Sequence, residues 1–414
     1  MEIWKEIILG NYITIITDYH SNGSYKDLKK HTTIKYTPEH AIMVRIINFK
    51  KNDFEKDLIY LNKFEYEYLS KTKVFAGDIL MNKIADAGSV YLMPDLKRPV
   101  SLAMNLFLIR LNSQVDQKFI FYLMKLKEGY IKQYANGTSR STITKDAVRQ
   151  LRFKIPPLSI QKKIASILSS YDNLIDNNLK MIKILEELAL ITYEEWFLRL
   201  RFPGHEYVAI NSKTFLPQGW KYEHFSKHVE LLKGIEPGTI CYQSQPSSKT
   251  IPFLRVKNLI QDFSKVYHVS SSEWNSKICR KEDILLSLDG SPGLVKLGLS
   301  GAYSTGIRKT VLKNNSFSQV FIYCYLKSAP VQFLINAHAR GTTILHAGSS
   351  VKHMKILYPP KKILRDFNDK MMPSFNHILN LLNQNKALNE ARDILLGRLM
   401  TGVINVGNYD RGKC

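Results

Sequence analysis

The sequence is poor in cysteine and contains no long hydrophobic run. Its four cysteines, Cys241, Cys279, Cys324 and Cys414, lie far apart, which excludes a CxxC pair and the ligand spacing of a structural zinc site. We therefore expect reduced thiols in a cytosol and no metal site. No run of about eighteen apolar residues occurs, so no membrane span is expected. The first dozen residues lack the basic and then apolar regions of a secretory signal, so none is expected.

Motifs for catalysis are also missing. The sequence has no GxxxxGK[ST] phosphate loop and no glycine-rich strand–turn–helix, so we expect neither an ATP-driven motor nor a nucleotide cofactor in this chain. The paired prolines of YPPK (358–361) differ from an amino-methyltransferase loop, which has Asn or Asp before them and an aromatic residue after them. Asp283 and Asp289 lie in turn-like segments and form no nuclease pattern. The prediction is a chain without catalytic residues and without its own cofactor.

Acidic residues are few relative to basic ones, with 36 Asp and Glu against 59 Lys and Arg and a net charge of +23. Residues 1–157 contain 25 basic and 16 acidic residues, and residues 203–360 contain 19 and 9. Residues 158–202, which separate these regions, contain 6 of each. Two basic regions with a neutral segment between them predict two contacts on one polyanion, such as double-stranded DNA.

The neutral segment predicts one long helix. No proline or glycine occurs from Ile160 to Arg199, and apolar residues recur at heptad spacing. The first apolar row contains Ile164, Leu168, Ile175, Ile182 and Leu185, and a second row beside it contains Ile167, Leu174, Met181 and Leu188. Asn178 interrupts the first row. Its amide marks either a solvated kink or a buried contact that fixes the register with a partner helix.

The strongest organisational feature of the sequence is an internal repeat. The matching pairs are MVRIINF (43–49) with FLRVKNL (253–259), KFIFYLM (118–124) with QVFIYCYL (319–326), and AVRQLRFKIPP (147–157) with SVKHMKILYPP (350–360). A long helix is expected after each proline pair. The second runs from about Ile363 to Leu399, and Pro373 either kinks it or begins its long segment. Its apolar side contains Ile378, Leu382 and Leu388, and Asn385 again lies on the seam.

These patterns predict an α+β fold made of two tandem mixed α/β domains, residues 1–157 and 203–360, with helical segments at 158–202 and 361–414. The segments 41–49, 57–61, 88–93 and 105–111 are predicted strands, and 119–135 is a predicted helix. Neither long helix can bury its apolar stripe alone. We therefore expect an antiparallel, coiled-coil-like pair with pseudo-two-fold symmetry and one basic lobe at each end. Two copies of residues 1–202 would pair similarly, with their Asn178 amides meeting.

Glycine-containing loops with polar side chains are the candidate DNA-binding elements. In the first lobe they are MNKIADAGS (81–89) and NGTSRSTIT (136–144), and in the second SLDGSPG (287–293) and ARGTTILH (339–346). The candidate residues are Asn82, Lys83, Ser89, Thr138, Ser139, Arg140, Ser141, Asp289, Ser291, Arg340, Thr342 and Thr343. Arg45 and Arg255 lie in predicted strands, and they are candidates for DNA contact with a structural role as the alternative.

Several of these segments resemble a known family. PPLSIQKKIASIL (156–168), EEWFLRLRFPG (194–204) and LPQGW (216–220) resemble the central conserved region of type I restriction–modification specificity subunits, the S or HsdS subunits. GDIL (77–80), GTSRSTIT (137–144) and IPFLRVKNL (251–259) resemble parts of that family's target recognition domains. ARDILLGRLMTGVINV (391–406) is similar to its C-terminal conserved segment. The resemblance covers nearly the whole chain in the same order.

The resemblance implies a non-catalytic subunit that binds a split DNA sequence, with one half-site per target recognition domain. It implies that the helices space the two domains and dock two modification (M) subunits, which bring S-adenosylmethionine and methylate adenine at N6. Restriction (R) subunits, whose motor uses ATP and Mg, would join through the core that this chain forms with the two modification subunits. The location implied is the cytoplasm of a prokaryote, where such systems serve host defence.

Two other classes of protein remain as alternatives. A stand-alone DNA methyltransferase or nuclease with fused recognition domains would need a catalytic motif, and the sequence contains none that we identify. A coiled-coil adaptor without DNA would not need two basic lobes on either side of a neutral helix.

Overall fold

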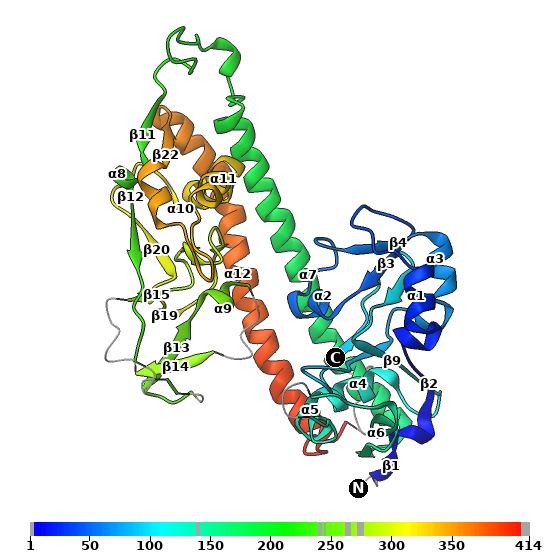
Figure 1. The fold of residues 1–414 in the computed structure, drawn as a ribbon. Helices are drawn as coiled ribbons and strands as arrows, with labels where there is room; N and C mark the ends of the chain where they lie inside the picture. Colours follow the sequence, from blue (N-terminus) through cyan, green and yellow to red (C-terminus); the bar gives the residue numbers. More distant parts are fainter. Residues whose placement is uncertain are drawn as a thin grey trace. The chain divides into compact units, whose positions relative to one another are not determined.

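The protein consists of two compact units that share two long helices. A computed structural model describes residues 4–137, 141–238, 242–243, 246–260, 266–270 and 277–406. Unit 1 contains residues 1–174 and 388–414, and unit 2 contains residues 175–387. The chain passes from one unit to the other inside α7 (Leu158–Tyr193) and returns inside α12 (Lys361–Met400), both drawn in Figure 1. In the described residues, no helix is long and apolar enough to span a membrane.

The described residues of unit 1 form two four-stranded sheets and one strand pair. The first sheet has the order β2 (Ile13–Asp18), β9 (Leu106–Leu111), β6 (Ile79–Asn82), β7 (Val90–Leu92). The second has the order β4 (Ile59–Leu61), β3 (Ala41–Val44), β8 (Val100–Leu102), β5 (Lys73–Val74), in which β3 and β8 are parallel. β1 (Lys5–Ile8) pairs with β10 (Arg152–Ile155), so the start of the unit lies beside the strand that leads into α7.

Unit 2 repeats this topology strand for strand. Its sheets have the orders β12 (Val229–Lys233), β20 (Ile307–Leu312), β16 (Leu285–Ser287), β18 (Val295–Lys296), and β14 (Tyr267–Ser270), β13 (Thr250–Leu254), β19 (Gly301–Tyr303), β15 (Ile278–Cys279). β13 and β19 are parallel, and β11 (Lys221–His224) pairs with β22 (Lys355–Tyr358). A short pair, β17 (Asp289–Gly290) with β21 (Leu345–His346), is additional. The internal repeat of the sequence is therefore a repeat of strand order, and the α+β class is confirmed.

Short helices complete each unit. Unit 1 contains α1 (Tyr25–His31), α2 (Ile46–Lys51), α3 (Lys63–Tyr68), α4 (Gln117–Leu126), α5 (Glu128–Lys132) and α6 (Lys145–Arg149). Unit 2 contains α8 (Phe225–His228), α9 (Val256–Ile260), α10 (Gln319–Lys327) and α11 (Ala329–Ala337). The predicted helix at 119–135 is thus two helices, because the backbone at Lys127 leaves helical geometry before α5 begins.

The predicted strand at 41–49 is wrong in its second half. β3 ends at Val44, and α2 begins at Ile46 because the Asn48 side chain turns back and its Oδ1 accepts a hydrogen bond from the Arg45 backbone N at 2.8 Å. The same turn follows β13, where Asn258 Oδ1 accepts from the Arg255 backbone N at 2.9 Å. Arg45 and Arg255 therefore stand at a strand end before a helix and not inside strands.

Both long helices form where the apolar stripes predict them. α7 changes to a single π-helical turn at Glu194–Leu198, so the α-helical part is shorter than the predicted forty positions. α12 continues through Pro373 without ending there. Pro157 precedes α7, and its carbonyl accepts hydrogen bonds from the backbone N of Ile160 and of Gln161 at 3.0 and 3.1 Å. The prolines thus close the preceding strand and begin the helix.

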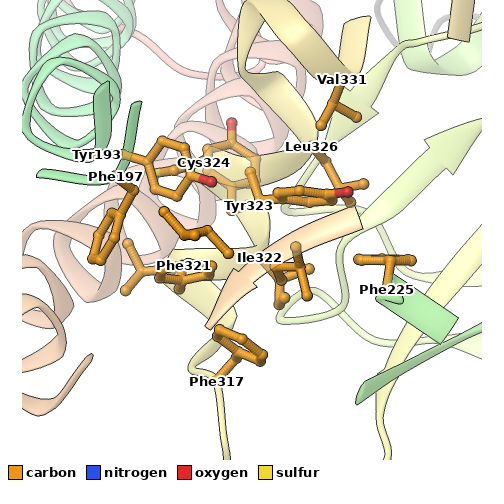
Figure 2. Packing of buried hydrophobic residues seen from close by; sticks show 14 of the residues in the cluster. Tyr193, Phe197, Phe225, Phe317, Phe321, Ile322, Tyr323, Cys324, Leu326 and Val331 are labelled. Carbon is orange, nitrogen blue, oxygen red and sulfur yellow. The ribbon is translucent and has the colours of Figure 1, made fainter. Parts of the chain in front are cut away.

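The core of each unit includes parts of both long helices. In unit 1, Ile164 and Leu168 of α7 and Leu399 of α12 pack with Phe119 and Leu123 of α4. In unit 2 the opposite ends of the helices contribute. Tyr193 at the end of α7 and Phe197 of the π-helical turn after it lie against Phe321 of α10 (Figure 2). Phe367 of α12 belongs to the same cluster. Phe197 lies 4.8 Å from Phe321 and 5.1 Å from Phe367 between ring centroids. The helices are therefore structural parts of both units.

Candidate nucleic-acid interface and helix pair

The two candidate loops of unit 1 lie side by side. The Ala85 backbone N donates to the Ser141 carbonyl at 3.0 Å, and Ser141 Oγ donates to the Ala85 carbonyl at 2.7 Å. The Ile143 backbone N donates to the Lys83 carbonyl at 3.1 Å. The described parts of segments 81–89 and 136–144, which are far apart in sequence, thus lie against each other. Thr138, Ser139 and Arg140, which the sequence also proposed for DNA contact, lie outside the described residues.

Two of the candidate residues in these loops are buried. Asn82 is fully buried, its Nδ2 donates to the Tyr91 hydroxyl at 3.4 Å, and its backbone N donates to the Ser89 carbonyl. Ser89 is also buried, and its Oγ donates to Glu128 Oε2 at 3.3 Å. In this conformation both side chains hold the base of the loop and do not face solvent. Ser141 is half-buried, and its hydroxyl is engaged in the contact between the loops.

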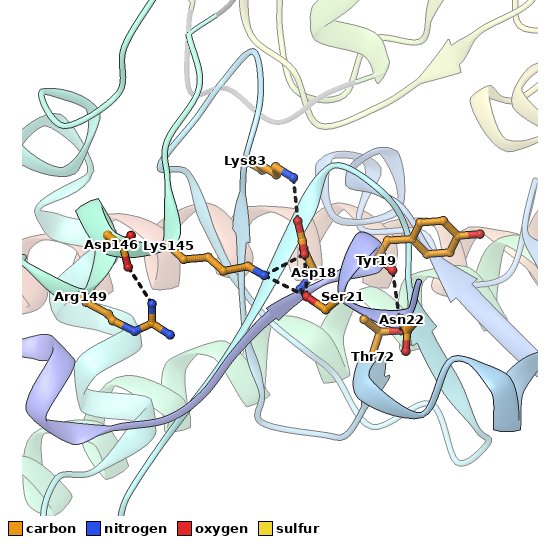
Figure 3. Close-up of polar contacts among 9 residues, drawn as sticks. All are labelled: Asp18, Tyr19, Ser21, Asn22, Thr72, Lys83, Lys145, Asp146 and Arg149. Atoms are coloured by element: carbon orange, nitrogen blue, oxygen red, sulfur yellow. Dashed lines mark hydrogen bonds and ion pairs between the residues drawn. The ribbon is translucent and has the colours of Figure 1, made fainter. Parts of the chain in front are cut away.

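Lys83 belongs to an ionic cluster that the sequence did not reveal. Its Nζ donates to Asp18 Oδ2 at 2.6 Å, and Lys145 Nζ donates to Asp18 Oδ1 at 2.9 Å (Figure 3). Ser21 Oγ also donates to Asp18 Oδ1 at 2.9 Å. Burial by itself raises the pKa of Asp18, but the hydrogen bonds from the two lysines and Ser21 outweigh it and lower the pKa to about 2. No local pattern connects residues 18, 83 and 145, so only the fold could identify them together.

Replacing Asp18 with Asn should destabilise unit 1 at neutral pH. The pKa falls from 3.8 to about 2 on folding, which corresponds to about 2 kcal/mol of stability. Because the pKa is lowered, this contribution is complete above pH 3.8 and is lost as the pH falls through about 2. Urea unfolding of wild type and Asp18→Asn should differ most at pH 7, and the difference should shrink below about pH 4.

The matched control for this variant is Asp95→Asn. Asp95 pairs with Lys97 at 2.6 Å, but both side chains are exposed, and ion pairs between exposed side chains contribute little to stability. If Asp18→Asn lost no more stability than Asp95→Asn, or if its loss were independent of pH, the ion pairs of Asp18 with the two lysines would not stabilise unit 1.

The counterpart loops of unit 2 also meet. β17 and β21 pair Asp289 with His346, and the Ala347 backbone N donates to the Leu288 carbonyl at 2.7 Å. Asp289 Oδ1 lies 2.8 Å from His346 Nδ1, and Arg308 Nη2 donates to Asp289 Oδ2 at 3.3 Å. The segments 287–293 and 339–346 therefore form a surface that corresponds to the one in unit 1, again with a carboxylate at its edge, here bound to an arginine and a histidine side chain.

The remaining candidates of unit 2 differ in exposure. Arg340, Thr342 and Thr343 are exposed, and the Arg340 backbone exchanges hydrogen bonds with His346 at 3.0 and 2.7 Å, so its position is fixed while its side chain faces solvent. Ser291 is half-buried in the turn after Asp289. That turn requires glycine at Gly293, where φ is +92° and a Cβ would lie 2.6 Å from Gln332 Oε1.

Arg45 and Arg255 occupy equivalent positions and are engaged locally. Arg45 Nη2 donates to the Asp57 carbonyl, and the Arg255 guanidinium lies 4.5 Å above the Tyr267 ring. Each has a buried Nε with no hydrogen-bond partner among the described residues. Because these contacts involve the guanidinium groups themselves, they favour the structural role of both arginines over a DNA contact.

The long helices pair antiparallel inside each unit. In unit 1, Asp172 Oδ1 of α7 accepts from Arg392 Nη1 of α12 at 2.8 Å. In unit 2, Asn178 Nδ2 donates to Asn385 Oδ1 at 2.8 Å, and Ile182, Ile378 and Leu381 form a buried cluster with Leu185 and Leu382 against it. The partner number on α12 falls as the number on α7 rises. Ile164, Leu168 and Ile175 are buried on the same side of α7, and Leu388 is half-buried on α12.

One face of α7 remains exposed and apolar. Leu174, Met181 and Leu188 of the predicted second row are exposed, and so are Ile184 and Ile191, which do not belong to either predicted row. Their spacing of three and four residues places them on one side of the helix. The sequence does not show how wide the contact with α12 is. Only the packed partner shows which of two adjacent apolar rows of α7 is covered.

Comparisons with known proteins agree with the resemblance found in the sequence. A family model described as "Type I restriction modification DNA specificity domain" matches residues 47–187. The chain is 25% identical over 375 residues to the type I restriction enzyme MjaIX specificity subunit of Methanocaldococcus jannaschii, with 84% of each chain covered. It is 22% identical over 406 residues to the HindI specificity subunit of Haemophilus influenzae, covering 81% of this chain and 88% of that one.

A solved structure shares the fold. The crystal structure of the type I restriction-modification system S subunit from M. genitalium has a TM-score of 0.54 with this chain, at 15% identity, and 96% of each chain is covered. The architecture of sheets and long helices described above is therefore that of a known structure along nearly its whole length.

Proposed function

We infer that this chain is a specificity subunit of a type I restriction–modification system, which recognises the DNA target. The family match, the relatives that cover most of its length and the shared fold support this inference. We further propose that the target is bipartite, with one half-site bound by each unit. The observation that carries this proposal is the repeated pair of loops, at 81–89 with 136–144 and at 287–293 with 339–346, on two units of the same strand order.

The charge distribution supports DNA as the ligand. The two sequence regions that contain the loop pairs have excesses of nine and ten positive charges, from 25 basic against 16 acidic residues and from 19 against 9. Such excesses provide the phosphate contacts that supply most non-specific affinity, while exposed polar side chains on loops can reach base edges. Arg340 is the best placed of the described candidates, because its backbone is fixed and its side chain is exposed.

We assign the chemistry of the complex to other subunits. In this proposal the chain positions two modification subunits, which use S-adenosylmethionine to methylate adenine at N6, and restriction subunits with ATP and Mg bind to that core. The proposed docking surface for a modification subunit includes the exposed apolar face of α7, with Met181, Ile184, Leu188 and Ile191. The proposed location is the prokaryotic cytoplasm, where the DNA is.

Replacing Arg340 with Ala should relax recognition in one half-site only. A lost base contact of this kind reduces discrimination by about 1–3 kcal/mol, or roughly five- to 150-fold. The variant, combined with modification subunits, would be tested by mapping N6-methyladenine across a genome with single-molecule sequencing. Lys352→Ala removes an exposed cation outside the loop pair and is the matched control, for which the motif should stay unchanged.

The outcome separates the proposed function from its alternatives. Relaxation of both halves by Arg340→Ala would contradict independent recognition by the two units. Methylation by the purified chain with S-adenosylmethionine alone would instead indicate a stand-alone methyltransferase, and failure to shift any duplex with the modification subunits present would favour an adaptor without DNA.

A further inference from the structure

The internal repeat gives each seam residue of α7 a counterpart in α12. Aligning Pro156 and Pro157 with Pro359 and Pro360 places Ile175 on Ile378 without a gap. The burial of the two helices supports this alignment, since the buried residues Ile164, Leu168 and Ile175 correspond to the buried residues Phe367, Met371 and Ile378. By the same alignment, Asn178 corresponds to Leu381, and Ile182 corresponds to Asn385.

The repeat therefore relates the polar contact between the two asparagines to an apolar contact elsewhere on the seam. Asn178 Nδ2 donates to Asn385 Oδ1 at 2.8 Å, and Asn385, which is 7% exposed, also donates from Nδ2 to the Ile175 carbonyl at 3.4 Å. Exchanging each residue for its counterpart converts this pair into Leu381 and Ile182, which lie together in the buried cluster with Ile378. One crossing of the seam thus joins amide to amide, and the related crossing joins aliphatic to aliphatic.

Pairing of like helices would break this match. If a second copy of α7 took the place of α12 in the same geometry, Asn178 of each copy would face Ile182 of the other. Two copies of α12 would place Asn385 against Leu381, also twice. An amide that faces an aliphatic side chain loses its hydrogen bond. Because Asn385 is buried and Asn178 is half-buried, a pair of α12 helices would bury two unsatisfied amides, and a pair of α7 helices would leave two half-buried amides unsatisfied. If two copies of α7 kept this register, their Asn178 amides would not meet, which differs from the arrangement expected from the sequence.

We propose that Asn178, Asn385, Ile182 and Leu381 form a pairing code by which α7 selects α12 and rejects a second α7. The code concerns the choice of helix and is independent of whether the chain binds DNA. Such discrimination matters during synthesis. Because α7 is synthesised before α12, its apolar stripe can bind another chain until α12 has been made. Polar residues on a seam discriminate between partners mainly by destabilising the wrong helix pair, and less by stabilising the right one.

Two variants of the full chain test the code. The apolar variant, Asn178→Ile with Asn385→Leu, removes both amides, so like and unlike pairings become equally apolar. The relocated variant adds Ile182→Asn and Leu381→Asn to those changes. It restores an amide pair in the unlike pairing, at the repeat-related crossing, and again places amide against aliphatic in the like pairing. It is therefore a matched control with more substitutions than the apolar variant.

The measurement is refolding from urea at a series of chain concentrations, followed by light scattering for mass. Wild type and the relocated variant should remain monomeric. In the apolar variant the association constant for dimers should rise by roughly a hundredfold, since two unsatisfied amides no longer oppose association. Energy transfer between donor- and acceptor-labelled chains, with the dye on Lys180→Cys in a Cys241→Ser, Cys414→Ser background, would identify pairing through α7. Lys180 is exposed and lies midway between Asn178 and Ile182.

The proposal fails if the apolar variant stays monomeric under these conditions, or if the relocated variant associates as strongly as the apolar one. A double-mutant cycle provides a second measurement that does not depend on association. Asn178→Leu and Asn385→Leu should each lower the urea midpoint, and the double variant should recover most of the loss because neither amide is left unpaired. Additive losses would show that the two amides do not act as a pair.

Discussion

Raising the salt concentration from about 50 to about 200 mM should weaken binding of a target duplex by roughly 10³–10⁵-fold, if the chain neutralises about six to ten phosphates. The physical reason is counterion release, because each Lys or Arg that replaces a condensed cation makes binding less favourable as bulk salt rises. The net charge of +23, with basic excesses in both sequence regions that contain loop pairs, supports contacts of this number. Exposed Lys26, Lys29 and Lys30 of α1 are examples of side chains able to make them.

The experiment is a fluorescence anisotropy titration at five or more salt concentrations, with the slope of log affinity against log salt as the result. A duplex of the same sequence with an uncharged methylphosphonate backbone is the control, and its binding should depend little on salt. Unfolding midpoints at the same salt concentrations separate an effect on binding from an effect on the fold. A slope near zero for the natural duplex would contradict the DNA-binding proposal.

Replacing Phe321 with Ala should destabilise unit 2 by about 3–5 kcal/mol, which is the loss expected for a fully buried phenylalanine. Phe321 is 1% exposed, and its ring contacts those of Tyr193, Phe197, Phe317 and Phe367. The cavity would open where the end of α7 and the start of α12 join the core, so both helices lose packing there (Figure 2). The surrounding rings are held by one another and can fill only part of the space.

Phe333→Ala is the control for this prediction, because Phe333 belongs to the same unit and is 76% exposed. Its removal should change stability by less than about 0.5 kcal/mol. Urea unfolding followed by tryptophan fluorescence is suitable, since Trp196 and Trp220 are both buried in the core around Phe321. A loss for Phe321→Ala no larger than that of Phe333→Ala would mean that the cluster relaxes to fill the cavity.

Local sequence patterns were sufficient for the long helices and the repeat. A stripe of apolar residues at heptad spacing without proline or glycine has one favourable solution, so α7 was predictable within a few residues. The same reasoning failed at 41–49, where Asn48 ends a strand by binding the Arg45 backbone. The β-branched residues of this segment predicted that the strand continues. The hydrogen bond to the Asn48 side chain instead favours the start of a helix at Ile46.

The sequence alone determined that this protein contains two basic, repeated α+β domains and two long amphipathic helices, because composition, spacing and self-similarity are properties of the chain itself. Only the tertiary structure decided which loops meet and which polar side chains are available. Asn82 is buried and Arg340 is exposed although both occur in glycine-containing loops, and Asp18 binds Lys83 and Lys145 across 65 and 127 positions. Whether Asn178 was a kink or a contact depended in the same way on Asn385. Burial and pairing depend on distances in space, and strand order sets those distances through contacts that no local pattern in the sequence contains.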